Sequence, residues 1–83
     1  MSMSKPTDIV HERRGPSMEG IDSWCYFWYE PRILRWYIEA HAGTDLCQTE
    51  TMDRRPTEAE LNAIMHNLVT HAVWREVNGL ELC

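Results

Sequence analysis

This sequence predicts a small α+β domain in which one amphipathic C-terminal helix packs on an antiparallel sheet. Two patterns carry the prediction: an aromatic-rich stretch interrupted by a proline, and a later apolar stripe with helical spacing. The length of 83 residues is that of one domain, so we expect a single domain over residues 1–83. It excludes Rossmann folds, kinases and barrels. Strands come first and the helix follows, which favours two stacked layers.

Residues 1–20 are predicted to form an extended N-terminal arm. They are polar, contain Gly15 and two prolines, Pro6 and Pro16, and show neither a helical nor a strand period. A short strand is expected within the arm, at Asp8–His11. An arm of this kind is either mobile or fixed across the sheet.

Antiparallel strands are expected over residues 22–52. Asp22–Glu30 is dense in the aromatic residues that favour a pleated surface. Pro31 lacks an N–H to donate to a strand ladder, so it marks a turn. Ile33–Ala40 then completes a β-hairpin, and Leu46–Met52 is the expected third strand.

A capping box predicts where the helix begins. The side chains of Thr57 and Glu60 are spaced so that each can bond the backbone N–H of the other. The helical segment is therefore expected over residues 57–78, where Gly79 supplies the left-handed stop. Residues 80–83 form a short tail or an added edge strand. At about 100° per residue, one stripe faces the sheet: Leu61, Ile64, Met65, Leu68, Val69 and Ala72.

Trp74 falls on the side of the predicted helix away from that apolar stripe. A tryptophan in such a position needs a cover or a partner. The N-terminal arm is the expected cover, and a second binding patch is the alternative.

The register of the hairpin decides which aromatic side chains are exposed. A loop of two or four residues places Cys25, Phe27 and Ile38 under the helix. The opposite face then carries these directly opposed pairs: Trp28 with Arg35 in a cation–π contact, Tyr26 with Tyr37, and Trp24 with Glu39.

A loop with an odd residue count would instead bury Trp24, Tyr26 and Trp28 together with Trp36. We favour the first register because it buries Phe27, the aromatic side chain that has no polar group, and exposes the charged side chains. The sheet face away from the helix is then the candidate partner-binding patch: Trp24, Tyr26, Trp28, Arg35, Tyr37 and Glu39.

The sequence contains no catalytic or metal-binding motif. There is no Cys-x-x-Cys, no His-x-x-x-His and no glycine-rich phosphate loop, and His66 and His71 point about 140° apart on the helix. We therefore expect no enzyme activity, no metal and no cofactor. The three cysteines, Cys25, Cys47 and Cys83, have no close spacing, which indicates free thiols in a reducing compartment.

The charge balance favours a protein partner. Eight Lys and Arg residues against thirteen Asp and Glu residues give a net charge of −5. Nucleic-acid binding needs a basic footprint, whereas an acidic domain suits a basic partner surface. No stretch approaches the ~20 apolar residues that cross a bilayer, and no secretory signal is present, so we expect a cytoplasmic protein with no membrane contact.

In general character the chain resembles phage-encoded inhibitors of bacterial defence, the anti-CRISPR proteins among them. The resemblance rests on the aromatic hairpin from Trp24 to Tyr37 and on the acidic residues around the sheet: Glu30, Glu39, Asp45, Glu50 and Asp53. It implies a protein that acts in the host cytoplasm and sterically occludes a nucleic-acid-binding defence complex without chemistry.

Three function hypotheses follow from the residues themselves. The first is a protein-binding module anchored by aromatic residues of the patch, with Arg35 and Glu39 setting orientation and Trp74 as a second patch. The second is a single-stranded nucleic-acid binder that stacks bases on the same side chains. The third is a self-associating protein whose sheet face forms a homodimer interface.

Overall fold

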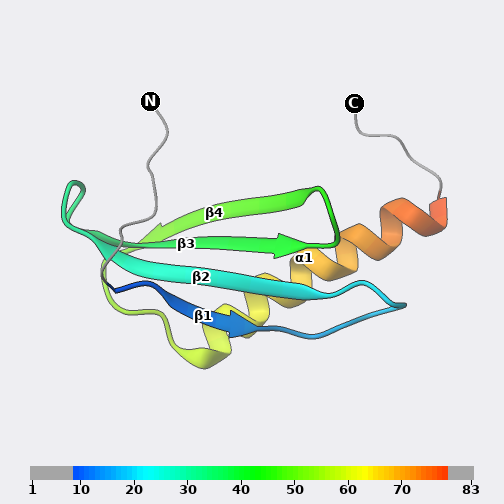
Figure 1. Ribbon diagram of the computed structural model, residues 1–83, viewed down its shortest axis with the longest axis horizontal. Coiled ribbons are helices and arrows are strands. Elements are labelled where there is room, and N and C mark those ends of the chain that lie inside the picture. The colour runs from blue at the N-terminus through cyan, green and yellow to red at the C-terminus, as the bar shows by residue number, and fades with distance from the viewer. Residues whose placement is uncertain (1–8, 79–83) are drawn as a thin grey trace.

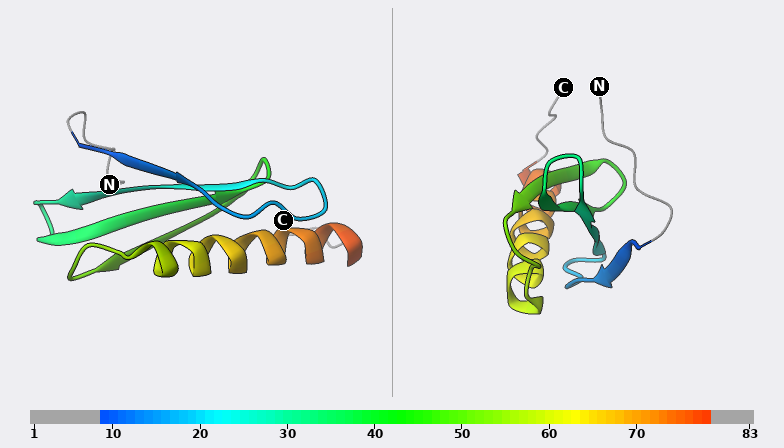
Figure 2. Two further views of the ribbon diagram at one scale, coloured as in Figure 1. Left: turned by 90° about the horizontal axis from the view of Figure 1, so that it is seen from below. Right: turned by 90° about the vertical axis from the view of Figure 1, so that its left-hand side faces the viewer.

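Four antiparallel strands and one helix form a two-layer α+β fold in the computed structural model, which describes residues 9–78. The strands follow the order β1-β2-β3-β4 in one sheet, and α1 lies across one of its faces (Figure 1, Figure 2). The predicted fold class is confirmed. The elements are β1 (His11–Arg14), β2 (Ser23–Glu30), β3 (Arg35–Ala42), β4 (Leu46–Met52) and α1 (Glu58–Asn78).

Two predicted strands had wrong boundaries. The strand of the N-terminal arm lies at His11–Arg14 and pairs with β2, whereas Asp8–His11 was expected; Asp8 lies outside the described residues. The second strand of the hairpin begins at Arg35, because Leu34 has a φ of 56°, which does not fit a strand. The predicted glycine stop and the tail at residues 80–83 also lie outside the described residues.

The observed register divides the hairpin into the two predicted faces but shifts the individual pairs by two positions. Phe27 lies opposite Ile38, and both side chains face α1. On the other face, the opposed pairs are Trp24 with His41, Tyr26 with Glu39, and Trp28 with Tyr37. Arg35 therefore lies opposite Glu30, not opposite Trp28. The shift arises because the observed loop, Pro31–Leu34, is centred between Arg32 and Ile33. The predicted loop is centred one residue earlier, between Pro31 and Arg32.

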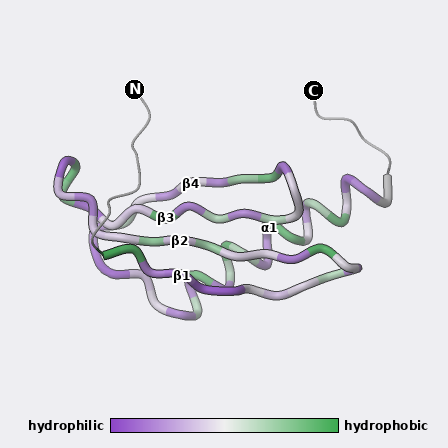
Figure 3. Tube along the Cα trace, viewed as in Figure 1, coloured by the Kyte–Doolittle hydropathy of each residue, from purple (hydrophilic) through white to green (hydrophobic). Residues whose placement is uncertain are grey.

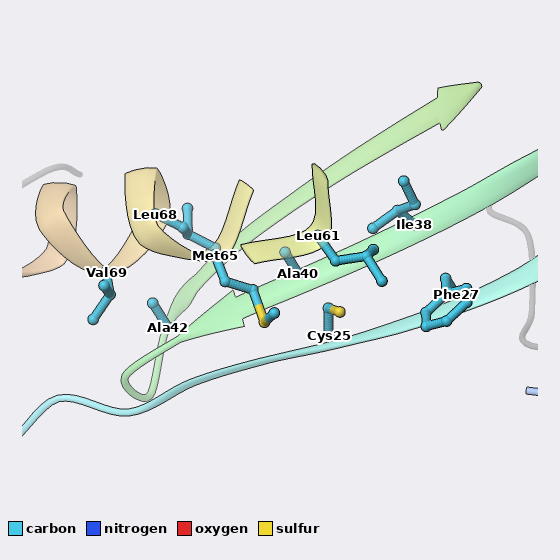
Figure 4. Packing of buried hydrophobic residues seen from close by; sticks show 9 residues of the cluster. All are labelled: Cys25, Phe27, Ile38, Ala40, Ala42, Leu61, Met65, Leu68 and Val69. Atoms are coloured by element: carbon cyan, nitrogen blue, oxygen red, sulfur yellow. The ribbon is translucent and has the colours of Figure 1, made fainter. Parts of the chain in front are cut away.

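The core lies between the sheet and α1 (Figure 4). Its buried residues come from β2, β3 and the predicted helical stripe: Cys25, Phe27, Ile38, Ala40, Ala42, Leu61, Met65, Leu68 and Val69. Burying each of the larger side chains among them (leucine, isoleucine, valine, phenylalanine or methionine) contributes about 1.5–3 kcal/mol relative to exposure. This apolar layer fixes which sheet face is left for other contacts.

The chain between β1 and β2 packs closely against the same core. A Cβ atom at Gly15 would lie 2.6 Å from Sδ of Met65 and 2.6 Å from Oγ of Ser23, so a side chain does not fit there. Met18 and Ile21 are partly buried against the core cluster. The described part of the arm is thus fixed beside the helix.

Candidate functional site

The sheet face away from α1 carries the residues of the candidate patch that belong to the hairpin. Side chains alternate between the two faces of a strand, and the alternate residues of β2 and β3 pack in the core. We call the following set the open face: Trp24, Tyr26, Trp28, Arg35, Tyr37, Glu39 and His41. It joins six of the seven predicted site residues and adds His41.

An aromatic cluster forms at one end of the open face. The Trp24 ring stacks on His41, with centroids 5.4 Å apart and planes 10° apart. Tyr26 meets His41 edge-on at 5.9 Å. Nε2 of His41 lies 2.7 Å from a carboxylate oxygen of Glu39. These contacts hold Trp24 and Tyr26, both half-buried, in a fixed arrangement.

His41 was not among the site residues predicted from the sequence, because the sequence pattern places it in a turn. The observed β3 runs to Ala42, so His41 continues the alternation of Tyr37 and Glu39. That alternation was the signal that could have identified it.

Trp28 is the main correction to the predicted patch. Its side chain is only 1% exposed, although it lies on the open face as predicted. The ring packs on Tyr37 with centroids 4.9 Å apart, and its Nε1–H donates to Oε1 of Glu30 at 3.2 Å. Trp28 therefore supports the open face from within and is not an exposed anchor.

The β2–β3 loop closes on the buried Glu30, which is 2% exposed. Arg32 donates from Nε at 2.6 Å and from Nη2 at 2.7 Å to the Glu30 carboxylate. These Arg32 bonds, helped by the bond from Trp28, lower the pKa of Glu30 to about 2. At the tip of this loop, Leu34 is 73% exposed and Ile33 is also exposed.

Trp74 lies apart from the other predicted site residues. It is on α1, 50% exposed, with its ring stacked on His71 at a centroid distance of 6.1 Å. The described part of the N-terminal arm does not bury it, so the expected cover is not observed within residues 9–78. Trp74 lies in the helix layer, whereas the open face is the side of the sheet away from α1. A single flat interface therefore cannot contact both.

An acidic hollow lies beside Trp24. Its volume is about 560 Å³, and it is bordered by the turn at residues 19–22, the turn at residues 43–45 and the last turns of α1. Arg75 spans part of it and donates to Asp45 at 3.2 Å. Its charged lining residues are four carboxylates and one guanidinium: Glu19, Asp22, Asp45, Glu76 and Arg75.

This hollow concentrates the negative charge of the molecule. Residues 9–78 contain seven arginines and eleven carboxylates, a net charge of −4, and the hollow alone carries −3. A basic group approaching this end of the open face meets a complementary potential.

The remaining chemistry of the described residues is limited. Residues 9–78 hold no group of three or more His, Cys, Asp or Glu side chains placed to bind a metal, and no helix among them is both apolar and long enough to cross a membrane. Cys25 and Cys47 are free cysteines. Desolvation raises the pKa of both thiols, and the Glu39 charge adds to the rise at Cys47. Both thiols are therefore weaker nucleophiles than an ordinary cysteine.

The chain matches no protein-family model, no curated protein and no solved structure. Its function must therefore be inferred from its own residues.

Proposed function

We propose that this protein is a non-enzymatic binding module whose open face docks on a basic surface of another protein. The observation that carries the proposal is the fixed cluster of Trp24, Tyr26 and His41 next to the acidic hollow. Tryptophan and tyrosine are the side chains most enriched among residues that dominate binding energy. An aromatic anchor beside a charged hollow combines affinity with orientation.

Most of the open-face residues have a defined role in this proposal. Trp24 and Tyr26 supply contact area, and their contacts with His41 reduce the conformational entropy lost on binding. Arg35 and Glu39 orient the partner, and Arg35 is exposed with its Nε donating to Thr51. The buried Trp28 supports the face from below.

The finer version of the proposal names the partner class. A nucleic-acid-binding defence complex of a bacterial host exposes basic surfaces, and an acidic module on such a surface blocks access by occlusion. This version places the protein in the host cytoplasm as a phage inhibitor. It needs no reaction and no cofactor.

A comparison of matched tryptophan variants tests the proposal. Tagged wild-type protein, Trp24→Ala and Trp74→Ala are used to capture partners from a bacterial lysate. We expect one stoichiometric protein complex with the wild type and Trp74→Ala, its loss with Trp24→Ala, and release by salt. A complex that depends on Trp74 and not on Trp24 contradicts the proposed face, and no complex contradicts the proposed function.

Titration with a short single-stranded oligonucleotide separates the nucleic-acid alternative. Stacking of bases on Trp24 would quench tryptophan fluorescence, with an affinity that falls as salt rises. We expect no quenching, because the acidic hollow beside Trp24 repels phosphate.

A further inference from the structure

The two edges of the sheet are protected to very different degrees. The strand at one edge, β1, has four residues, all hydrophilic (purple in Figure 3), and Pro16 follows shortly after it. The strand at the other edge, β4, has seven residues, contains neither proline nor lysine, and carries one charged side chain, Glu50. Edge strands are usually short, charged or interrupted by proline, because an unprotected edge pairs with another strand.

The outer edge of β4 is accessible in the structure. Among the residues that the structure describes, β3 is the one strand paired with β4, and β4 forms the far border of the sheet in Figure 1. Four of its seven residues are exposed: Cys47, Gln48, Thr49 and Thr51. Threonine is a residue type enriched in strands, and none of the four side chains blocks pairing with another strand.

We propose that β4 pairs antiparallel with β4 of a second copy of this chain, about a two-fold axis at Thr49. The sequence of β4 is self-complementary in this register. The opposed pairs are Leu46 with the partner's Met52, Cys47 with the partner's Thr51, Gln48 with the partner's Glu50, and Thr49 with the partner's Thr49. In this register the apolar side chains of Leu46 and Met52 lie opposite each other, and the side-chain amide of Gln48 can donate to the carboxylate of Glu50.

Neighbouring symmetric registers are worse. A two-fold axis at Glu50 opposes two carboxylates directly, and an axis at Gln48 opposes Leu46 with Glu50. The axis at Thr49 is also the one that pairs all seven residues of the strand. A second copy is therefore a better occupant of this edge than an arbitrary strand.

The pairing would build one eight-stranded sheet. Directly opposed residues of an antiparallel pair point to the same face, so both α1 helices lie on one side and both open faces lie on the other. This inference uses the edge of the sheet and does not rest on the proposed function of the open face.

Disulfide trapping tests the register. In a Cys47→Ser, Cys83→Ser background, Thr49→Cys places two thiols opposite each other at the axis. The expected Cα–Cα separation is about 4.5–5.5 Å, which is within disulfide range. We expect rapid formation of a covalent dimer under mild oxidation.

The matched control is Thr51→Cys in the same background. Its two copies lie four positions apart along the strands, roughly 13 Å, so they should not cross-link. Restoring Cys47 should switch cross-linking on, because Cys47 faces position 51 of the partner. Equal cross-linking of Thr51→Cys with and without Cys47, or none for Thr49→Cys, would overturn the proposal.

Charge variants at Gln48 test the same contact without a covalent bond. Gln48→Glu places a carboxylate opposite the partner's Glu50 at two symmetry-related positions in each dimer, so it should raise the dimer dissociation constant about tenfold. Gln48→Lys places an ammonium group there and should lower the dissociation constant by a similar factor. Sedimentation velocity over a concentration series measures the dissociation constant, and thermal melts at low concentration report on the monomer. A wild-type protein that stays monomeric at every concentration, or the same shift for both variants, contradicts the proposal.

Discussion

Replacing Trp28 by alanine should destabilise the fold strongly rather than only remove a contact with a partner. Trp28 is 1% exposed, packs on Tyr37 and donates to the buried Glu30. The change removes a large buried side chain and leaves a cavity on the open face, away from the core under α1. Loss of Trp28 therefore destabilises the hairpin itself.

The expected cost can be worked from burial. Truncating a buried tryptophan to alanine costs about 3–5 kcal/mol. A chain of 83 residues has a total stability of about 4–12 kcal/mol. Each kcal/mol shifts the melting temperature of a domain of this size by about 4–8 °C, so the melting temperature should fall by about 12–40 °C. Tyr26→Ala, which truncates a half-buried ring on the same face, should cost less than about 2 kcal/mol.

Thermal unfolding followed by circular dichroism distinguishes the two variants. We expect Tyr26→Ala to give a cooperative transition near that of the wild type, and Trp28→Ala to be largely unfolded or to melt far lower. If Trp28→Ala melts within a few degrees of the wild type, the tryptophan is not packed as described and the reasoning is refuted. In that event Trp28 would again qualify as an exposed anchor.

Three further changes test other parts of the structure. Gly15→Ala should lower stability by about 1–3 kcal/mol, because the added Cβ overlaps Met65, and an unchanged urea midpoint would contradict that close approach. Leu34→Gly should raise the melting temperature slightly, because relief of a left-handed conformation worth about 1–2 kcal/mol exceeds the entropic cost of glycine of about 0.5–1 kcal/mol; a lower melting temperature argues against the strain. The folded pKa of Glu30, about 2, lies below its unfolded value, so its stabilisation is present above pH ~4.5 and is lost as pH falls towards 2. Glu30→Gln should flatten the melting-temperature profile over that range, and an unchanged slope would show that other carboxylates dominate it.

The helix and the division of the hairpin faces were predictable because local rules determine them. Thr57 and Glu60 form the predicted capping box, with the Thr57 N–H donating to Glu60 at 2.8 Å and the Glu60 N–H donating to Thr57 at 3.2 Å. The alternation that puts Cys25 and Phe27 under the apolar helix stripe follows from strand geometry alone. These signals need no knowledge of distant residues.

The prediction from the sequence placed the first strand wrongly, because tertiary contacts and not a local pattern stabilise this strand. The residues of β1 are strongly polar, and no local pattern marks them as a strand. Arg13 donates to Glu58 at the start of α1 at 2.8 Å, and its guanidinium lies 5.6 Å from the ring centre of Phe27. Contacts between residues this far apart in the sequence cannot be inferred from β1 alone.

The same limit explains which parts of the candidate site were missed. Alternation places six predicted residues on one face, but the burial of Trp28 depends on Glu30 and on a loop in which Arg32 folds back. The acidic hollow combines residues from three separate segments, so no local window contains it. Spatial neighbours, not sequence neighbours, create both features.

The open face and the β4 edge are two surfaces of one sheet, so pairing at the edge changes what the face can bind. In the proposed dimer, five strand spacings separate the β2 strand of one copy from that of its partner, about 24 Å at ~4.8 Å each. Trp24 is level with Cys47, two positions from the axis, so the two Trp24 clusters are also offset by four positions, roughly 13 Å, along the strands. They would lie about 27 Å apart on one continuous surface. A partner with two basic sites at this spacing would gain affinity by avidity, and Gln48→Glu would weaken its binding without altering the open face. A monovalent partner would bind the Gln48→Glu variant and the wild type equally, so a comparison of the two separates the edge from the face.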